Sequence, residues 1–474
     1  MAIHTQSRNS TAVKTSLDQT QVEQLRTEFR GRLIQAGDPA YEEARKIYNG
    51  MIDKRPALIE RCRDTADVIS AVRFSHDQDL PVAVRAGGHH AAGLSLVEDG
   101  LVIDLSLMKG IHLDPKAGSV RVQPGCTLGD MDHATNTLGM AVPSGFVSTT
   151  GISGLTLGGG VGYLSRAYGL TIDNLLEADL VLADGRFVIA NREENEDLFW
   201  AIRGGGGNFG VVTSLQFKLN PVNVVYGGPM LWPIEKSARI MKFWRDYILQ
   251  APENINGWFG FFTVPPIDMF PKEHHLKKAC ALVWCYTGDM SKAEQVFKPI
   301  REFEPPLIDF AGPIPFPALQ SLFDGLLPPG LQWYWRADFV KDLSDEAINV
   351  HTKYGNQLPT MISTMHLYPI NGAAHKLGSH ETAWSYRDAN FVQIIGAVDS
   401  EPTNNERMIQ WAKDYWQAAH PYSMGGGYLN LMWEEGQERI QESFRDNYPR
   451  LAEIKKKYDP TNFFRSNQNI KPKA

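Results

Sequence analysis

The stretch VRAGGHHAAG, residues 84–93, follows the apolar residues LPVAV and carries two histidines directly after a Gly-Gly pair. An apolar run that ends in glycines is typical of a strand that leads into a tight turn. The backbone N–H groups of such a turn can bind an anion, most commonly a diphosphate. The stretch therefore predicts a strand followed by a ligand-binding loop that carries His89 and His90.

The residues around this loop predict a βαβ unit and hence a parallel sheet. ALIERC and LPVAV are expected to be strands, and the residues between them have helical spacing, with Thr65 as the expected cap. Residues 18–37 upstream have apolar positions at helical spacing and are expected to form one amphipathic helix. From Gly100 onward, short alternating runs with Asp-Gly and Ala-Gly turns predict a mixed sheet.

Two further glycine-rich loops are GISGLTLGGGVG, residues 151–162, and RGGGGNFGVV, residues 203–212. From about residue 221 the chain becomes rich in aromatic residues and proline, which predicts a second domain of antiparallel strands. The tail YDPTNFFRSNQNI, residues 458–470, has the polarity of a segment that is held by specific contacts.

The composition excludes several classes of protein. The chain has 474 residues, 43% of them hydrophobic and 21% charged, which is typical of an enzyme of two or three domains. A net charge of -7 argues against a nucleic-acid partner, and four scattered cysteines provide no metal site. The first residues lack an apolar signal core, and no stretch is long enough to span a membrane, so we expect a cytoplasmic protein with no membrane partner.

The glycine loops have three interpretations. One loop alone could serve only tight packing, but three loops beside apolar strands indicate a large bound cofactor. GGGVG superficially resembles the nicotinamide-binding fingerprint of a dehydrogenase. It does not follow a buried β-branched strand, however, and Asp173 comes too soon after it to complete a mononucleotide-binding unit.

The motifs VRAGGHH, VQPGCTLGDM, GISGLTLGGGVG, RGGGGNFGVV and YDPTNFFRSNQNI, in this order, resemble those of the berberine bridge enzyme-like flavoproteins of the vanillyl alcohol oxidase superfamily, bacterial type. The resemblance covers residues 81–219 and the tail. It implies an α+β fold with a two-part FAD-binding domain, of the PCMH type, and a central substrate domain whose antiparallel sheet is covered by helices. The expected boundaries are 1–54 for the leader and first helix, 55–220 for the FAD-binding domain, 221–445 for the substrate domain and 446–474 for a segment returning to the FAD domain.

The resemblance implies that FAD is attached covalently to His89. Many relatives carry a second attachment through a cysteine, but here Val147 stands at that position, and Cys126 lies in an earlier segment. We therefore expect a single histidyl link. The residues expected to bind FAD are Arg85, Ala86, Gly87, Gly88, His89, His90, Gly93, Ser148, Gly151, Gly154, Gly159, Gly160, Gly162, Gly210, Val212, Tyr428, Asn467 and Gln468.

The resemblance also implies catalytic residues. A flavin takes a hydride from a substrate carbon, and a protein group must remove the accompanying proton. The family pattern Tyr-x-Asn-Tyr is represented by Tyr428 and Asn430, with Leu431 in place of the second tyrosine, so Tyr428 is the first candidate for the proton acceptor. Further candidates for the substrate cleft are Tyr334, Arg336, Asp338, His366, Tyr368 and Tyr386.

Thr150 precedes Gly151 at a position that borders the oxygen-accessible side of the flavin in relatives, and a small residue there would admit molecular oxygen. The sequence thus favours an oxidase that acts on a C–O or C–N carbon of a small ring-containing molecule, such as a sugar, a phenolic or a specialised metabolite. Two alternatives stay open: a flavin dehydrogenase with another electron acceptor, and a flavin-containing binding protein of low turnover, which Leu431 would explain.

Overall fold

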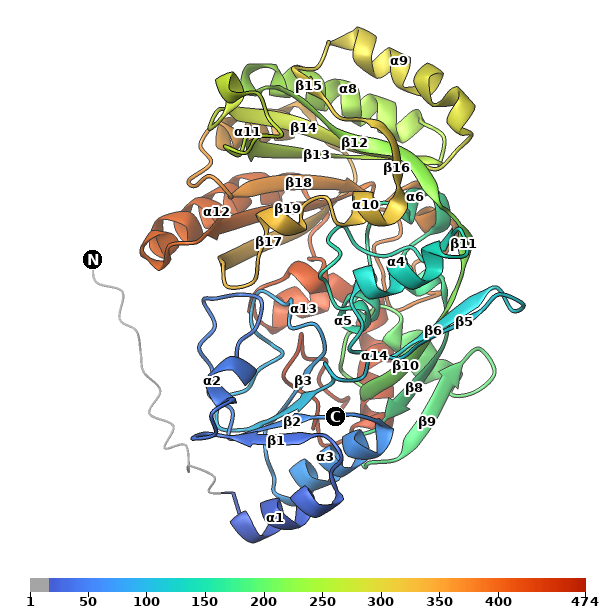
Figure 1. Cartoon of the computed structure of the whole chain (residues 1–474), viewed down its shortest axis with the longest axis vertical. Coiled ribbons are helices and arrows are strands. Elements are labelled where there is room, and N and C mark those ends of the chain that lie inside the picture. The colour runs from blue at the N-terminus through green and yellow to red at the C-terminus, as the bar shows by residue number, and fades with distance from the viewer. Residues whose placement is uncertain (1–16) are drawn as a thin grey trace.

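The computed structural model describes residues 17–474, and the polar leader, residues 1–16, lies outside them. The molecule has two parts, which Figure 1 shows one above the other. The lower part contains two sheets built from the first half of the chain, together with the C-terminal helix. The upper part contains one large antiparallel sheet with helices on its outer face.

The first sheet of the lower part contains the predicted βαβ unit. Its strands are β1 (Arg32–Gln35), β2 (Leu58–Arg61), β4 (Leu101–Asp104) and β3 (Val82–Arg85), in that spatial order. β2 and β3 both run parallel to β4, so the predicted parallel sheet is confirmed. Helix α3 (Thr65–Asp77) joins β2 to β3, and its cap is Asp64, not Thr65, because the Asp64 carboxylate accepts the N–H groups of the first turn.

The single long helix expected over residues 18–37 is wrong. Helix α1 (Gln19–Glu28) ends early, and the chain continues as strand β1, which pairs antiparallel with β2. Gly31 permits this change, because a Cβ there would lie 1.9 Å from the carbonyl oxygen of Arg61. The helical spacing correctly predicted the first half of the segment, whereas pairing with the distant strand β2 makes the second half a strand. A short helix, α2 (Tyr41–Ala44), follows β1.

The second sheet of the lower part is entirely antiparallel, so the mixed sheet predicted from Gly100 onward is wrong. Its spatial order is β5 (Ile111–Asp114), β6 (Ser119–Val122), β10 (Val211–Lys218), β8 (Leu175–Val181) and β9 (Phe187–Asn191). The one parallel strand of that stretch, β4, joins the first sheet instead. Short turns require antiparallel pairing only within the hairpins β5–β6 and β8–β9, whereas the pairing of β10 with β6 and β8 joins segments that are distant in the sequence. A small pair, β7 (Met140–Ala141) and β11 (Asn220–Pro221), lies at the exit to the upper part.

Four helices of the lower part connect these strands and carry the glycine loops at their ends. They are α4 (Leu128–Asn136), α5 (Ile152–Leu157), α6 (Ser165–Tyr168) and α7 (Glu196–Ile202). Because GGGVG follows helix α5 and not a strand, the nicotinamide-binding interpretation fails on geometry as well.

The upper part has the expected antiparallel sheet covered by helices. Its strands, in spatial order, are β15 (Ile308–Asp309), β12 (Val224–Pro233), β14 (Lys278–Tyr286), β13 (Ile255–Thr263), β18 (Thr364–Pro369), β19 (Phe391–Asp399) and β17 (Gln332–Val340), and β16 (Gly312–Pro315) also pairs with β12. The helices are α8 (Ser237–Gln250), α9 (Ala293–Phe303), α10 (Phe316–Gln320), α11 (Asp345–Gly355) and α12 (Asn405–Ala419).

The large sheet buries both of its faces. One face packs against helices α8, α9, α11 and α12, with Trp244 and Phe259 in that core. The other face packs against the lower part, where Trp258 and Val392 meet Val161 and Tyr163. Successive residues of one strand therefore belong to two different hydrophobic cores. One core lies under the helices, and the other lies between the sheet and the lower part.

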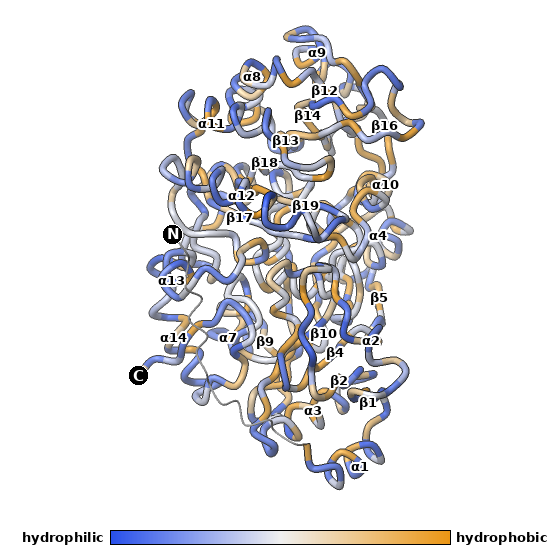
Figure 2. The backbone as a smooth tube through the Cα atoms, turned by 90° about the vertical axis from the view of Figure 1, so that its left-hand side faces the viewer, coloured by the Kyte–Doolittle hydropathy of each residue, from blue (hydrophilic) through white to orange (hydrophobic). Residues whose placement is uncertain are grey.

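The C-terminal segment returns to the lower part through helices α13 (Gln437–Phe444) and α14 (Tyr448–Tyr458), as Figure 1 shows. Its anchor is Lys455, whose buried ammonium pairs with Asp459 at 2.6 Å and donates to the carbonyl oxygens of Asn208 and Phe464. Hydrophobic residues gather on the inner strands of the lower part, and hydrophilic ones on outer turns (Figure 2). No helix among residues 17–474 is long and apolar enough to cross a membrane, and no acidic, histidine or cysteine cluster there could hold a metal ion.

Candidate active site

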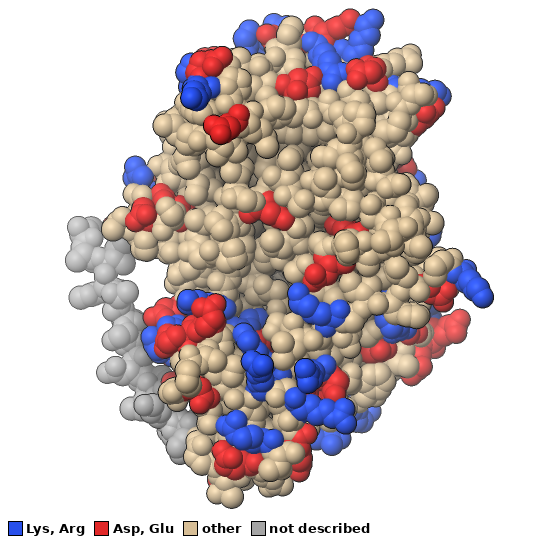
Figure 3. All heavy atoms as spheres, in the orientation of Figure 1, with Lys and Arg blue, Asp and Glu red and all other residues tan. Residues whose placement is uncertain are grey.

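One cavity of about 310 Å³ lies where the lower part meets the large sheet. Its wall is formed by the loop after β3, the segment 145–161, the loop 206–212, the turn 428–431 and the tail 464–468, together with Trp335 and Tyr368 from the sheet. All three glycine-rich loops and the C-terminal tail, which are far apart in the sequence, therefore meet around one space. On the face drawn in Figure 3, most charged side chains lie toward the two ends of the molecule, and the middle is mostly uncharged.

Two glycines bring the first two loops into backbone contact. A Cβ on Gly87 would lie 2.6 Å from the backbone nitrogen of Gly151, and a Cβ on Gly151 would lie 2.7 Å from that of Gly87. Any side chain at either position would push the loops apart. The glycines in VRAGGHH and TTGISG therefore serve first to join the two loops, and the joined loops form one wall of the cavity.

His89 lies in this wall with its ring fixed on two sides. The ring stacks on Tyr48 with 3.8 Å between centroids, and Nε2 lies 3.2 Å from the Thr149 hydroxyl. Nδ1 has no hydrogen-bond partner among residues 17–474. Burial lowers the pKa of His89 to about 4, although a hydrogen bond to the Thr149 backbone opposes this shift, so the imidazole is neutral at pH 7.

His90 differs from His89 because both of its nitrogens are occupied. The backbone N–H of Ala92 donates to Nδ1 at 3.3 Å, so Nε2 carries the proton and donates to the carbonyl oxygen of Leu429 at 3.3 Å. Burial also lowers the pKa of His90 to about 4. His90 thus ties the first loop to the turn at residues 428–431, while His89 keeps a nitrogen free.

Most of the predicted site residues line the cavity. They are Ala86, Gly87, Gly88, His89, His90, Thr150, Gly151, Gly154, Gly210, Val212, Tyr428, Asn430, Asn467 and Gln468. Six predicted cofactor-binding residues do not line it: Arg85, Gly93, Ser148, Gly159, Gly160 and Gly162. The structure places these six outside the lining of the cavity, so their direct contact with a cofactor stays a prediction.

Each of the six has a structural role. Arg85 forms a buried ion pair with Asp104 at 2.6 Å, and Ser148 bonds through its backbone N–H and hydroxyl to Asp324. Gly93 permits close packing against a neighbouring isoleucine.

The glycines of GGGVG make room for neighbouring groups of the protein. A Cβ on Gly158 would lie 2.1 Å from Oδ1 of Asn430, and one on Gly159 would lie 2.1 Å from the Trp384 ring. Gly160 and Gly162 are equally close to a threonine and to backbone carbonyl oxygens. Their sequence pattern resembles a phosphate loop, and for Gly158 and Gly159 only contacts from residues more than 200 positions later reveal the packing role.

Tyr428 and Asn430 lie together in the segment between helices α12 and α13. The Tyr428 oxygen accepts hydrogen bonds from the Gly160 backbone N–H at 3.2 Å and from Asn430 Nδ2 at 2.9 Å. Burial, partly offset by these donors, raises the pKa of Tyr428 to about 12, so it is a phenol at neutral pH. With two N–H groups directed at its oxygen, Tyr428 is better placed to donate a proton than to accept one.

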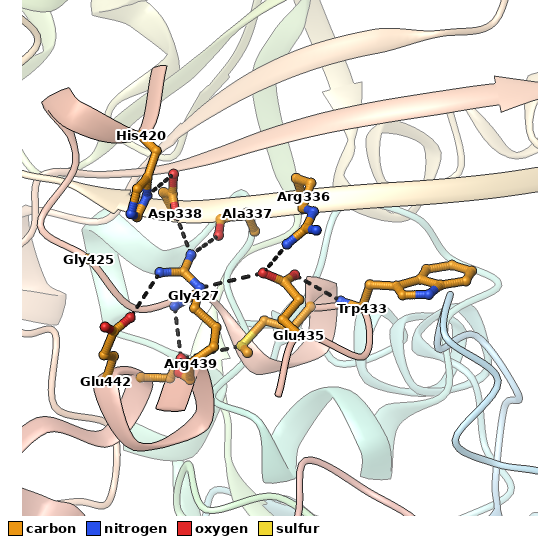
Figure 4. Close-up of polar contacts among 12 residues, drawn as sticks. Arg336, Ala337, Asp338, His420, Gly425, Gly427, Trp433, Glu435, Arg439 and Glu442 are labelled. Carbon is orange, nitrogen blue, oxygen red and sulfur yellow. Dashed lines mark hydrogen bonds and ion pairs between the residues drawn. The ribbon is translucent and has the colours of Figure 1, made fainter. Parts of the chain in front are cut away.

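A buried ion network holds this turn against the large sheet (Figure 4). On strand β17, Asp338 pairs with Arg439 of α13 and lies 3.1 Å from Nδ1 of His420. Arg336 pairs with Glu435 at 2.5 Å, and Glu435 also accepts the Trp433 backbone N–H.

Arg336 and Asp338 therefore point toward α12 and α13 and not into the cleft, contrary to their prediction as cleft residues. Trp335, the residue before Arg336 in the sequence, lines the cavity instead. Tyr334 lies in the helix-side core, and Tyr386 donates its hydroxyl to the carbonyl oxygen of Glu442, away from the cavity.

The end of the cavity nearest the sheet is aromatic and uncharged. Phe146 stacks on Tyr368 with 4.0 Å between ring centroids, and Trp335 and Leu431 complete this end. The Trp335 indole N–H is buried and has no partner among residues 17–474, so it can donate to an oxygen of a ligand. None of the described lining residues is Asp, Glu, Lys or Arg.

Sequence reasoning missed several lining residues, among them Phe146, Val147 as a wall residue, Leu155, Asn208, Trp335 and Ser466. Phe146 and Leu155 could have been found from their position beside the predicted glycine loop. Trp335 could not, because the strand pattern gives two faces without saying which one meets the lower part.

The residues present fit a bound dinucleotide. Gly87, Gly88, Gly151, Gly154 and the glycines of residues 206–210 line one continuous surface, on which backbone groups are the available anion ligands. A Cβ on Gly154 would meet nothing within 4 Å, although the residue lies in the cavity wall. Asn467 donates to two backbone carbonyl oxygens but keeps Oδ1 buried without a partner among the described residues.

Comparison with known proteins gives two family matches. The family described as "FAD binding domain" matches residues 56–191, and the family described as "Berberine and berberine like" matches residues 427–471. These segments contain the first loop with its histidines and the Tyr428 turn with the tail, which are the two regions that the cavity brings together.

Similar proteins match over nearly the full length. An FAD-linked oxidoreductase of Dictyostelium discoideum is 32% identical over 447 residues, which are 94% of this chain and 95% of that protein. The (R)-6-hydroxynicotine oxidase of Paenarthrobacter nicotinovorans is 28% identical and covers 94% and 98%.

Solved structures are similar over the same length. The crystal structure of 6-hydroxy-D-nicotine oxidase from Arthrobacter nicotinovorans has a TM-score of 0.83 at 25% identity, covering 94% of this chain and 98% of that one. A berberine bridge enzyme-like protein of Physcomitrella patens has a TM-score of 0.85 at 24% identity, covering 96% and 99%.

Proposed function

Because the chain belongs to the berberine bridge enzyme-like family of FAD-linked oxidoreductases, we propose that it holds FAD in this cavity through one covalent bond to His89 and oxidises a small uncharged ring-containing molecule. The observation that carries the proposal is the convergence of three glycine loops, His89 and the C-terminal tail on one cavity. Bound there, FAD supplies the acceptor for a hydride from a substrate carbon.

His89 is suited to a covalent bond with carbon. A neutral imidazole offers a lone pair on the nitrogen that carries no proton, and burial keeps His89 neutral at pH 7. Stacking on Tyr48 and the bond to Thr149 fix the ring, so little further ordering is needed. Val147 lines the cavity where a second, cysteine-mediated link would be expected, and this supports a single attachment.

The lining supports a neutral substrate with a ring. An ionised substrate would leave its charge without a partner here, which is costly in a buried site. Phe146 and Tyr368 offer stacking surfaces, and the Trp335 N–H offers one hydrogen-bond donor. The printed name of one relative, (R)-6-hydroxynicotine oxidase, fits oxidation of a ring compound at a C–N carbon, and an alcohol carbon is the other candidate.

We propose molecular oxygen as the electron acceptor. Thr150 lines the cavity directly before Gly151, at the point where the two glycine loops touch. Its side chain is small, so it leaves room for oxygen beside the expected ring of FAD. A dehydrogenase with another acceptor is the alternative, and it predicts slow reaction of the reduced protein with oxygen. We also propose a cytoplasmic location for the protein.

The test begins with the purified protein. It should be yellow, and the colour should stay with the protein after acid precipitation. His89→Ala should release the colour into the supernatant, whereas the matched variant His90→Ala, which removes the neighbouring imidazole, should retain it. Colour that survives acid precipitation in His89→Ala would refute the assigned attachment.

The second step identifies the reaction. Anaerobic mixing with a panel of neutral aromatic alcohols, cyclic amines and sugars should bleach the flavin with at least one class, and admitted oxygen should restore the colour and yield hydrogen peroxide. Bleaching without recovery in oxygen would indicate the dehydrogenase. A failure to bleach with every member of the panel, while dithionite still bleaches the flavin, would favour a binding protein and refute the proposed activity.

A further inference from the structure

Three polar side chains form a row along strand β18 (Thr364–Pro369). Thr364, His366 and Tyr368 alternate along the strand and lie on the same face of the sheet. Nε2 of His366 lies 2.8 Å from the Thr364 hydroxyl, and Nδ1 lies 2.7 Å from the Tyr368 hydroxyl. Tyr368 lines the cavity, so the row leads from the proposed substrate end of the site into the sheet.

The direction of these hydrogen bonds follows from Thr364. Its hydroxyl donates to the carbonyl oxygen of Phe261 at 2.8 Å, and a hydroxyl has only one hydrogen to give. The Thr364 oxygen must therefore accept the Nε2–H of His366. In a neutral imidazole the other nitrogen then carries a lone pair, so Nδ1 accepts the hydrogen of the Tyr368 phenol.

The surroundings keep the pair neutral. Burial lowers the pKa of His366 to about 3, and burial, followed by the charges of Tyr163 and Tyr428, raises the pKa of Tyr368 well above its ordinary value. Those two tyrosines are the titratable groups that act on the pair. The other rings packed against it, Trp258 and those of Phe146 and Phe262, carry no charge.

The sheet is built to hold this row. The residues directly opposite on the neighbouring strands are glycines: Gly260 pairs with His366, and Gly396 pairs with Thr364. A Cβ on Gly260 would lie 2.7 Å from the Phe262 ring, which packs on His366, and 3.0 Å from Cδ2 of His366 itself, and both distances are tighter than ordinary contact. Glycine weakens a strand, so its presence beside the imidazole indicates that the space for the ring is needed.

We propose that Tyr368 is the group that accepts the substrate proton and that it passes its own proton to His366, with Thr364 fixing the direction of transfer. The inference rests on the proposed function, in which a two-electron oxidation removes one hydride and one proton. Tyr428 is less suited to this role, because two N–H groups already bind its oxygen.

The step balances as follows. The O–H or N–H proton of the substrate moves to the Tyr368 oxygen, the phenol proton moves to Nδ1 of His366, and the electron pair of the substrate C–H bond leaves as hydride to FAD. The substrate is oxidised by two electrons and FAD is reduced by two. When oxygen takes up these electrons, the hydride and the proton that left the substrate supply the two hydrogens of hydrogen peroxide.

The first test needs no substrate. Protein labelled with ¹⁵N-histidine is studied at pH 7 by long-range ¹H–¹⁵N correlation, and the signals that disappear in His366→Gln are assigned to His366. They should show the neutral tautomer with hydrogen on Nε2. Thr364→Val should give a mixture of tautomers and Thr364→Ser should restore the single one. A wild-type His366 with hydrogen on Nδ1, or one that is protonated, would overturn the proposal even if substrates are found.

The second test uses the substrate identified by anaerobic bleaching. Tyr368→Phe should slow flavin reduction by about 10²- to 10⁴-fold, the usual contribution of a general base. The wild-type rate should be flat from pH 5.5 to 9, because neither partner titrates there, whereas the rate in Tyr368→Phe should rise with pH as hydroxide replaces the lost base. The matched control is Tyr163→Phe, which packs on the same Phe146 ring and should stay within threefold of wild type.

These outcomes separate the relay from the proposed function. If Tyr368→Phe reduces FAD within threefold of wild type, or raises KM while kcat is unchanged, the relay is wrong and the oxidase remains. If no substrate bleaches the flavin, the proposed activity fails, and the tautomer measurement alone decides whether the row has the predicted direction.

Discussion

Replacing Gly154 by alanine should have opposite effects on the empty protein and on its affinity for FAD. Gly154 lies inside helix α5 (Ile152–Leu157) and in the wall of the cavity. In the protein without ligand, an added Cβ would meet nothing within 4 Å. The same Cβ would project into the space that we assign to FAD, so the two effects have separate causes.

The magnitudes follow from these two environments. Alanine is favoured over glycine inside a helix by about 1 kcal/mol, so the apoprotein should gain roughly 0.5–1 kcal/mol in its free energy of unfolding. An extra methyl group in a closely packed contact costs about 1–3 kcal/mol, which corresponds to an FAD dissociation constant about 5- to 150-fold higher.

The assay uses a His89→Ala background, in which the proposed covalent bond is absent and FAD can be removed and titrated. Urea unfolding of the apoprotein gives the stability, and quenching of FAD fluorescence gives the dissociation constant. Gly325→Ala is the matched control: its Cβ also meets nothing within 4 Å, but the residue does not line the cavity, so the dissociation constant should not change. An unchanged dissociation constant in Gly154→Ala would refute the placement of FAD against helix α5.

Three other perturbations test the packing around the site. Asp338→Ala removes one of the two buried carboxylates that pair with Arg439 and should cost about 1–3 kcal/mol in urea unfolding, whereas Glu442→Ala, which removes an exposed partner of the same arginine, should cost less than about 1 kcal/mol. Burial opposes ionisation of Asp104, but its ion pair with Arg85 and its hydrogen bonds hold its pKa below 3.8. The ionised carboxylate therefore contributes fully to the free energy of unfolding above about pH 4, and this contribution is lost as the pH falls further. Asp104→Asn should make the free energy of unfolding less dependent on pH in that acid range. Gly87→Ala places a Cβ 2.6 Å from the backbone of the facing loop and should reduce the amount of FAD retained per protein, measured by absorbance, and cost about 1–3 kcal/mol of stability; full retention would show that the loops need not touch.

Part of the fold could be predicted from local patterns. The βαβ unit, the glycine turns and the antiparallel upper sheet depend on the spacing of apolar residues and on turn residues, which neighbours along the chain determine. The end of helix α1 (Gln19–Glu28) could not, because the next residues pair with β2 (Leu58–Arg61) through a close approach at Gly31. The antiparallel second sheet was missed because strand order is set by packing between distant segments.

The candidate site shows the same division. The loop with His89, the Tyr428 turn and the tail could be found because each is a compact motif in the chain. The packing role of Gly158 could not be predicted, since its neighbour Asn430 follows 272 positions later. Likewise, the alternation of β17 does not reveal that Trp335 faces the cavity while Arg336 pairs with Glu435.

The amino-acid order by itself determined that this protein has several glycine turns able to approach a cofactor, a histidine placed on the first of them, and a sheet with two chemically different faces. The tertiary structure alone decided which loops meet, which face of the sheet closes the cavity, and that Thr364, His366 and Tyr368 form a row leading to it. The physical reason is range: turns and strand alternation are fixed by bonds along the backbone, whereas cavity walls and proton paths are fixed by the packing of segments hundreds of residues apart.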